Sequence, residues 1–310
     1  MLFCLQQGAI QMLKTNKERL VKFKIQGKIM PPGALPNWTT GHDGRARKVP
    51  GTGGITLNFK VGDLANRYVS DHLEPCVSAT FDANPKERMS TQNQSFNIFS
   101  CIGNEVEVLN GSAKGKKGVV TGHHGGAEHV MIDFDDRTLN RLTYDDHLMI
   151  TSFGVGLEIS GYEEVSVFSL APELISKMPV KDCGDYLEVG VSALVPAVAM
   201  GSGLGMGQAF SGDYDIQTSD LETTRKFGLD RLKIGDLVAI LDHDSHYGWS
   251  YKQGAVSIGV IIHGDSMIAG HGPGCQTIMT SLKDKIRPKI MKDANIGRFM
   301  RLGRYRAKRG

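Results

Sequence analysis

Short runs of Val, Ile and Leu, bounded by Gly, Asn and Asp, recur along the chain, whereas apolar residues at helical spacing are scarce. This pattern is typical of strands joined by turns. It predicts a mainly β protein, of the β-rich α+β type, with a β-sandwich or barrel domain. Helices are expected near 171–178, where Pro172 fits a first turn, and near 281–293, where Pro288 starts or breaks the helix.

A smaller unit is expected inside this fold at 103–150, where short apolar runs alternate with turns rich in Gly and Lys. It resembles the KOW-type small β-barrel of ribosomal and transcription-elongation proteins, a module that serves both RNA binding and plain structural roles. The segments 12–102 and 151–282 would then form one β-rich domain around this insertion. The residues that carry the resemblance are Gly103, Val106, Val108, Gly111, Lys114, Gly115, Gly118, Val119 and Val120.

Composition and charge narrow the class of protein. The chain has 310 residues, of which 40% are hydrophobic and 22% charged, and the sequence has no apolar run of the length that a membrane helix needs. Residues 283–310 form a basic C-terminal tail with eleven Lys and Arg against two Asp, a charge of +9, so the rest of the chain carries 3 − 9 = −6. Such a tail contacts nucleic acid, stays solvated, or docks on the acidic body of its own or a neighbouring subunit.

The cysteines and the first residues indicate the compartment. Five cysteines are scattered without CxxC spacing, which favours a reducing cytoplasm over a disulfide framework or a zinc knuckle. Residues 1–11 lack the basic start and the cleavage site of a signal peptide, and a second Met follows at position 12. We therefore expect a cytoplasmic protein whose segment 1–11 is a non-native or frayed start.

Acidic and imidazole side chains recur at a spacing of two where strands end. The pairs are Asp213 with Asp215, Asp242 with Asp244, and His263 with Asp265. Residues i and i+2 of a strand point to the same face, so each pair can converge on one ion, and a complete site needs several strands. Mixed carboxylate and imidazole ligands suit zinc, manganese or iron. We predict a divalent metal held by Asp242, Asp244, His263 and Asp215, although Asp residues also cap turns without any ion.

Two glycine-rich loops accompany these pairs, at 200–207 and 270–274. Backbone amides without side chains can bind an anion or a developing negative charge, and neither loop has the spacing of a nucleotide-binding motif, so no nucleotide cofactor is expected. A tight structural loop is the alternative. The predicted substrate-binding residues are Gly201, Ser202, Gly203, Gly272, Gly274 and His124, and the predicted catalytic residues are His271, Asp244 and Asp213.

Further segments are rich in His. The loop 123–129 holds three His and one Glu, and 71–75 reads Asp-His-Leu-Glu-Pro. Each could bind a metal or substrate, or be an ordinary surface loop. Cys275 lies four residues after His271, so a Cys–His nucleophile is conceivable, but a small core cysteine is the default.

Taken together, these motifs resemble an uncharacterised domain-of-unknown-function family of thermophilic bacteria, archaea and anaerobes. The resemblance spans nearly all of 12–280 and implies a mostly β fold without an established activity. Cys76 stands where the family pattern would have Gly, and Cys275 where it would have an aliphatic residue, which weakens the case for cysteine chemistry. The motifs that carry it are 71–75, Cys101-Ile-Gly-Asn104, 119–126, 200–205, Gly212-Asp-Tyr-Asp-Ile216 and 270–274.

A weaker likeness is to the acetamidase and formamidase enzymes, which resemble this chain in their repeated Gly-Asp strand starts, here Gly62-Asp63, Gly212-Asp213 and Gly235-Asp236. That resemblance implies metal-assisted amide hydrolysis. No catalytic residue carries across, because the chain has no clean Gly-Asp-His in the expected context.

Three functions remain open. The leading hypothesis is a metal-dependent hydrolase of a small polar, amide-like substrate. The alternatives are an RNA-binding protein that uses the barrel and the tail, and a small-molecule sensor without turnover. A small-molecule ligand and a homo-oligomer are expected, nucleic acid is the less favoured partner, and no membrane is involved.

Overall fold

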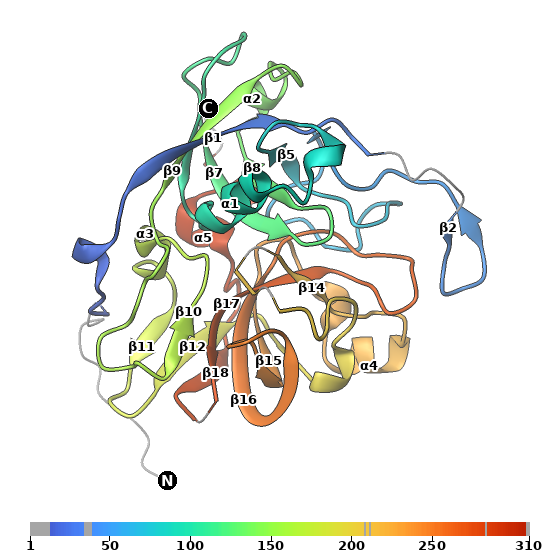
Figure 1. Ribbon diagram of the computed structural model, residues 1–310. Helices are drawn as coiled ribbons and strands as arrows, with labels where there is room; N and C mark the ends of the chain where they lie inside the picture. Colours follow the sequence, from blue (N-terminus) through green and yellow to red (C-terminus); the bar gives the residue numbers. More distant parts are fainter. Residues whose placement is uncertain (1–12, 34–38, 208, 211, 283, 308–310) are drawn as a thin grey trace.

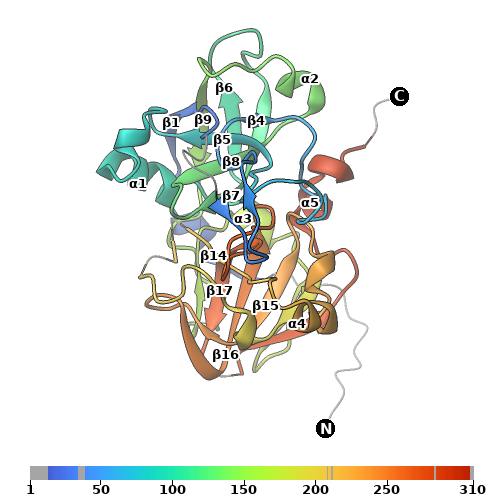
Figure 2. The ribbon, with the colours of Figure 1, turned by 90° about the vertical axis from the view of Figure 1, so that its right-hand side faces the viewer.

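The computed structural model describes residues 13–307, except for 34–38, 208, 211 and 283. The expected frayed start at 1–11 lies outside the described residues. Strands dominate the described part of the chain and helices are short, so the prediction of a mainly β fold is confirmed. Figures 1 and 2 show two bodies, a barrel and a second β-sheet region, that lie against each other.

The first body is a closed antiparallel barrel of six strands, with the order β1-β9-β6-β7-β8-β5 and a closing pair between β1 and β5. Its interior holds apolar side chains such as Val77, Val120 and Leu148, all fully buried. A short strand, β4 (Ile55–Thr56), pairs with the outer part of β5. The six strands are β1 (Phe23–Ile29), β5 (Cys76–Thr80), β6 (Glu105–Val108), β7 (Lys117–His124), β8 (His129–Asp133) and β9 (His147–Ser152).

This barrel draws on more of the chain than the segment 103–150 that we expected to form it. That segment supplies β6, β7, β8 and most of β9, whereas β1 and β5 come from residues that we had assigned to the surrounding domain. Four strands alone would leave two unpaired edges, and β1 and β5 fill them.

The second body contains a sheet with the order β10-β17-β16-β15-β13, with β14 paired to β17, and a three-stranded sheet β11-β12-β18. Their inward side chains share one apolar core that includes Val189, Ile240 and Ile258. The strands are β10 (Val165–Val167), β11 (Val180–Asp182), β12 (Leu187–Val191), β13 (Ala193–Val195), β14 (Tyr214–Asp215), β15 (Leu237–Asp244), β16 (Ser250–Ile261), β17 (Gly274–Ser281) and β18 (Ile286–Ile290).

Helices are short and lie around the sheets. The longest described helix, α1, packs on β1 and β5, and its Phe96 enters the barrel core. A two-stranded ribbon of β2 (Thr39–Thr40) and β3 (Ala46–Arg47) projects from the barrel side (Figure 1). The α-helices are α1 (Thr91–Phe99), α2 (Asp136–Leu139), α3 (Pro172–Ile175), α4 (Leu221–Lys226) and α5 (Ile296–Met300), and the 3-10 turns are Lys17–Arg19, Pro85–Glu87, Ala197–Ala199, Leu229–Arg231 and Gly303–Tyr305.

One of the two expected helices is wrong. The helix near 171–178 exists as α3, which begins at Pro172. The segment 281–293 instead contains strand β18, which pairs in parallel with β12 and places Pro288 opposite Val189. Because β18 lies at the edge of its sheet, the missing N–H of Pro288 is tolerated there, and pairing with β12 overrides the local helix signal.

The repeated Lys-x-Gly-Asp-Leu motifs at 60–64 and 233–237 contact each other and join the two bodies. In each motif the backbone N–H of the Lys donates to the carboxylate of the Asp, at 3.0 Å to Asp63 and 2.9 Å to Asp236. The N–H of Ile234 donates to the Asp63 carbonyl at 2.9 Å, and a β-bridge links the two motifs. The repeat therefore fixes the joint that holds the barrel against the second sheet.

The basic tail docks, in its described part, on the acidic body of its own chain. Arg304 makes hydrogen bonds of 2.7 and 3.0 Å to the buried carboxylate of Asp63, and Arg306 pairs with buried Asp133. At least these two arginines thus form ion pairs within their own chain. Within the described chain, no helix has both the length and the apolar character that a membrane crossing requires.

Candidate functional site

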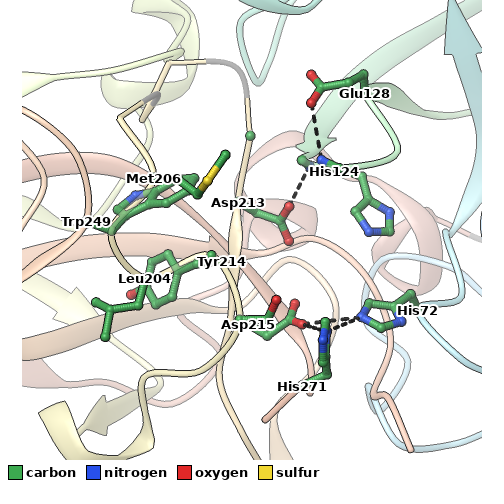
Figure 3. Close-up of a pocket in the computed structure, with 15 residues that line it drawn as sticks. His72, His124, Glu128, Leu204, Met206, Asp213, Tyr214, Asp215, Trp249 and His271 are labelled. Carbon is green, nitrogen blue, oxygen red and sulfur yellow. Dashed lines mark hydrogen bonds and ion pairs between the residues drawn. The ribbon is translucent and has the colours of Figure 1, made fainter. Parts of the chain in front are cut away.

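Three imidazoles and two carboxylates line a pocket between the two bodies (Figure 3), and a fourth imidazole, that of fully buried His263, lies behind them. The barrel contributes one imidazole from the end of β7 and one from the loop before β5. The second body contributes the two carboxylates from β14 and the residue just before it, and two imidazoles from the loop between β16 and β17. The pocket has a volume of about 370 Å³. The six side chains are His72, His124, Asp213, Asp215, His263 and His271.

Asp215 belongs to β14, a strand of two residues that pairs with the start of β17, and Asp213 immediately precedes this strand. Asp213 and Asp215 are two positions apart and so face the pocket together, while Tyr214 between them points the other way and stacks on buried His243. The register places Asp215 opposite Gly274.

The first set of ligand atoms surrounds one oxygen of Asp215. Oδ2 of Asp215 lies 2.6 Å from Nδ1 of His271 and 3.3 Å from Nε2 of His72, and these two ring nitrogens are 3.0 Å apart. His72 and His271 are partly exposed to the pocket, with 14% and 29% of their side-chain surface accessible, so ligand positions on that side remain open.

The second set lies deeper. Nε2 of His263 is 3.0 Å from Oδ2 of Asp213, and the rings of His263 and His124 stack with centroids 4.1 Å apart. All three residues are buried. The other Asp213 oxygen, Oδ1, accepts a hydrogen bond of 2.7 Å from the Gly125 N–H, which fixes the carboxylate.

In three of the imidazoles, Nδ1 contacts a carboxylate or a backbone carbonyl outside the two sets. The ring is thereby oriented with Nε2 toward the other ligand atoms. Nδ1 of His72 lies 3.0 Å from a carboxylate oxygen of Asp71, Nδ1 of His124 lies 2.6 Å from Glu74, and Nδ1 of His263 lies 2.8 Å from the Gly264 carbonyl. Metal-bound histidines are usually oriented in this way, by a carboxylate or a backbone carbonyl on the second ring nitrogen.

The buried carboxylates favour the protonated, positively charged form of the neighbouring imidazoles. Burial by itself lowers the pKa of His72, but hydrogen bonds to Asp215 and Asp71 outweigh it and raise that pKa to about 9. Burial likewise opposes the charge on His263, and Asp213 and Asp215 raise its pKa well above the ordinary value. Burial alone would raise the pKa of Asp215, yet its ion-pair contacts with the imidazoles of His263 and His271 lower it. A divalent cation meets the same demand for positive charge, so these residues fit a metal ion.

Gly274 makes the convergence sterically possible. A Cβ at this position would lie 2.0 Å from Oδ2 of Asp213 and 2.2 Å from Nε2 of His263. Any side chain here would occupy the space between two ligand atoms. We had predicted that Gly274 binds substrate. In the structure its missing side chain leaves room for Asp213 and His263 to approach each other.

Two predicted metal ligands lie elsewhere. Asp244 pairs with His246 at 2.5 Å, and Asp242 accepts a hydrogen bond from the Gly254 N–H inside the β15–β16 hairpin. Neither belongs to the six converging residues or to the pocket lining. We had expected both strands to deliver their side chains to one end of the sheet. Because β15 and β16 are antiparallel neighbours, the end of β15 lies at the hairpin and the end of β16, near His263, lies at the opposite end.

The glycine-rich loop 200–207 shapes the pocket without offering most of its amides to a ligand. Ser202 and Gly203 line the pocket, whereas Gly201 does not. The N–H groups of residues 201, 202, 204, 205 and 206 donate to backbone carbonyls, among them those of Asp215 and Gly270. The predicted anion-binding role of this loop is therefore wrong for these five amides. Gly272 is likewise packed against the Ile216 carbonyl, where a Cβ would lie at 1.9 Å.

His72 and Glu74 were not among the predicted site residues. Both lie in the motif Asp-His-Leu-Glu-Pro that the sequence analysis noted, but its meeting with β14 depends on how the barrel docks on the second sheet. The cysteine alternative has no support in the geometry. Cys275 is buried, and burial raises the pKa of its thiol far above the ordinary range.

The rest of the pocket has two different walls. Leu204, Met206 and Trp249 lie on one side and the imidazoles on the other (Figure 3). Glu128 borders the pocket near Asp213, and its carboxylate accepts a hydrogen bond of 3.2 Å from the Gly126 N–H. None of the described residues that line the pocket is Lys or Arg.

Comparisons with known proteins place the chain in a family. A family model described as domain of unknown function DUF4438, N-terminal, matches residues 38–176, and the corresponding C-terminal model matches 177–300. Among solved structures, the chain is similar to the protein TM1086, with 40% identity over 93% of this chain and 99% of that one, and a TM-score of 0.86. No curated protein matches. Because the two models together span 38–300, the chain belongs to the DUF4438 family.

Proposed function

We propose that this protein is a metal-dependent hydrolase that cleaves a small substrate with an amide-like polar group. The observation that carries the proposal is the convergence of four imidazoles and two carboxylates in and directly behind the lining of one pocket. Water bound to a divalent metal loses a proton near neutral pH, and the metal also polarises a carbonyl oxygen. Zinc, manganese and iron all suit this mixture of donors.

The residues of the pocket divide the remaining tasks. His72, His271 and Asp215 hold the pocket-facing ligand positions, and open coordination positions on that side admit water and substrate. Glu128 has a carboxylate at the pocket border that belongs to neither ligand set, and we assign it the transfer of a proton to the leaving group. Asp213 and His271, which we had predicted to be catalytic, act in this proposal as metal ligands.

The two walls define the substrate. Leu204, Met206 and Trp249 offer an apolar surface, and the described lining residues include no Lys or Arg to bind a carboxylate or a phosphate. The pocket volume of about 370 Å³ lies near the lower end of the range for small-molecule sites. A neutral amide with a short apolar substituent fits both walls. The free cysteines are consistent with action in the cytoplasm.

The test is hydrolysis by protein purified without a chelator and analysed for bound metals. We expect near-stoichiometric zinc, manganese or iron, and turnover of short acyl amides and anilides that is lost on chelation and restored by the metal. Asp213→Asn should abolish turnover, and Asp244→Asn, which changes a carboxylate outside the pocket, should leave it unchanged. Turnover by the metal-free protein or full activity of Asp213→Asn would refute the proposal. Binding of amides without any turnover would instead indicate a sensor.

A further inference from the structure

The converging ligand atoms form two sets. One consists of His72, Asp215 and His271, and the other of His124, Asp213 and His263, and within each set the ligand atoms lie within 4.8 Å of one another. Ligands on opposite sides of one ion lie about 4 to 4.6 Å apart, twice a bond of about 2.0 to 2.3 Å, and the contacts of 2.6, 3.0 and 3.3 Å in the first set and 3.0 Å in the second are shorter than that. Each set therefore has the size of the surroundings of one ion.

The carboxylate of Asp215 connects the two sets. Its Oδ2 lies 2.6 Å from Nδ1 of His271, and its Oδ1 points the other way and lies 3.4 Å from Nε2 of His263 in the second set. We propose that the site holds two divalent metal ions and that Asp215 bridges them. The inference rests on the metal centre of the proposed function and adds the number of ions and the bridge.

Two buried atoms in the deeper set face each other without a hydrogen bond. They are Oδ2 of Asp213 and Nε2 of His263, an ion pair 3.0 Å apart whose geometry is not that of a hydrogen bond, on side chains that are 3% and 0% exposed. Buried polar atoms that lack a hydrogen bond are costly and rare in native proteins. Two ligands at a right angle on one ion, with bonds of about 2.1 Å, lie about 3 Å apart. An ion bound to both atoms accounts for their position.

Each set also has its own supporting carboxylate, which contacts the Nδ1 atom of one of its histidines. Asp71, which orients His72, is itself held by Ser266 Oγ at 2.7 Å and by the Met267 N–H at 3.1 Å. Glu74, which orients His124, also accepts from the Gly53 N–H at 2.6 Å. Each set thus has its own carboxylate behind a histidine, as expected of two separately supported ions.

The sets differ in exposure, and this predicts two classes of affinity. All three residues of the deeper set are buried, so an ion there exchanges slowly and keeps few water ligands. The side chains of His72 and His271 are 14% and 29% exposed, so the outer ion carries the water and meets the substrate. Paired ions in hydrolytic centres lie about 3.5–4 Å apart, which is within the reach of one bridging carboxylate.

The experiment is a Mn²⁺ titration of chelator-stripped protein followed by electron paramagnetic resonance. We expect two equivalents per chain, with the signal of an isolated ion at the first equivalent and that of a spin-coupled pair at the second. His271→Ala should bind one equivalent and give no coupled signal. Asp215→Asn should abolish the coupling, whereas Asp244→Asn, outside the site, should match the wild type.

Saturation at one equivalent in the wild type, or two ions without coupling, would overturn the inference. If Asp215→Asn fails to fold, the wild-type stoichiometry and His271→Ala still decide the question. Amide hydrolysis measured on the same samples separates the two proposals. Hydrolysis by protein that binds one ion would refute the proposal of two ions and support the proposed hydrolase function. A spin-coupled pair of ions without hydrolysis would support two ions and refute the hydrolase function.

Discussion

Nδ1 of His124 lies 2.6 Å from the carboxylate of Glu74, and both side chains are buried. The same carboxylate lies 3.0 Å from Nδ1 of His129, which begins the next barrel strand. Glu74 therefore contacts the last residue of β7 and the first residue of β8, which flank the hairpin turn. It also orients the ring of His124 so that Nε2 faces Asp213 and His263.

Replacing Glu74 by Gln should weaken metal binding about 10- to 100-fold, because the imidazole of His124 loses the charged partner that orients it and increases its basicity. Competition with a fluorescent chelator measures the affinity. Glu173→Gln is a suitable control, since Glu173 is exposed and pairs only with Lys177 in the described contacts. An unchanged affinity in Glu74→Gln would show that His124 is not a ligand.

Gly274→Ala should abolish metal binding, because the added methyl group would lie between Asp213 and His263. Isothermal titration with Zn²⁺ measures the loss, and far-UV circular dichroism checks that the sheet is retained. Gly207→Ala is the control, since a Cβ there meets no atom within 4 Å. Full Zn²⁺ binding by the Gly274→Ala variant would mean that the ions lie elsewhere.

The sequence identified individual pieces of the site. Spacing by two placed Asp213 and Asp215 on one face of a strand, the end of an apolar run pointed to His263, and the glycine-rich turn 270–274 pointed to His271. Each of these inferences depends on local geometry alone. The fold class was predictable for the same reason, since strand and turn signals are local.

The meeting of these pieces was not predictable, because it depends on long-range pairing. Whether Asp244 or His263 reaches the pocket depends on which end of the β15–β16 pair faces the barrel. His72 comes from a loop whose position is fixed by the bond of its N–H to the Asp265 carbonyl, 193 residues away (265 − 72). The closure of the barrel by β1 and β5 is equally non-local and leaves no signal in 103–150.

His243 should make the protein less stable in acid. Burial lowers the pKa of His243 from 6.5 to about 4, so the unfolded chain takes up a proton on this residue at a higher pH than the folded chain does. The stabilisation is therefore complete above pH 6.5 and is lost as the pH falls toward 4. At about 1.4 kcal/mol for each pKa unit, the loss amounts to about 3 kcal/mol.

The measurement is urea unfolding of chelator-treated wild type and His243→Asn at several values of pH. Comparison of the two proteins removes the contribution of the other titrating groups. The difference in unfolding free energy between them should shrink by about 3 kcal/mol from pH 7 to pH 4. A difference that stays constant over this range would contradict the prediction.

The basic tail should contribute to stability through its arginines. Arg306 pairs with Asp133, whose carboxylate is 1% exposed and whose other partners are the Gly303 N–H and the thiol of Cys76. Arg306→Ala leaves this buried carboxylate without a charged partner, and we expect a loss of about 1–3 kcal/mol in the free energy of unfolding. Arg301→Ala in the same tail is the control, since the described structure places no ion pair on it.

The same pair of variants tests the RNA-binding alternative. If the arginines of the tail mainly stabilise the fold by pairing with buried carboxylates of the same chain (an internal clasp), single-stranded RNA should bind weakly at low salt. Filter binding should then give the same affinity for Arg301→Ala, Arg306→Ala and wild type. If the tail serves nucleic acid, each variant should bind RNA more weakly and reduce the salt dependence of binding by about one unit of slope. The second result, together with unchanged unfolding of Arg306→Ala, would favour the RNA-binding role over the clasp.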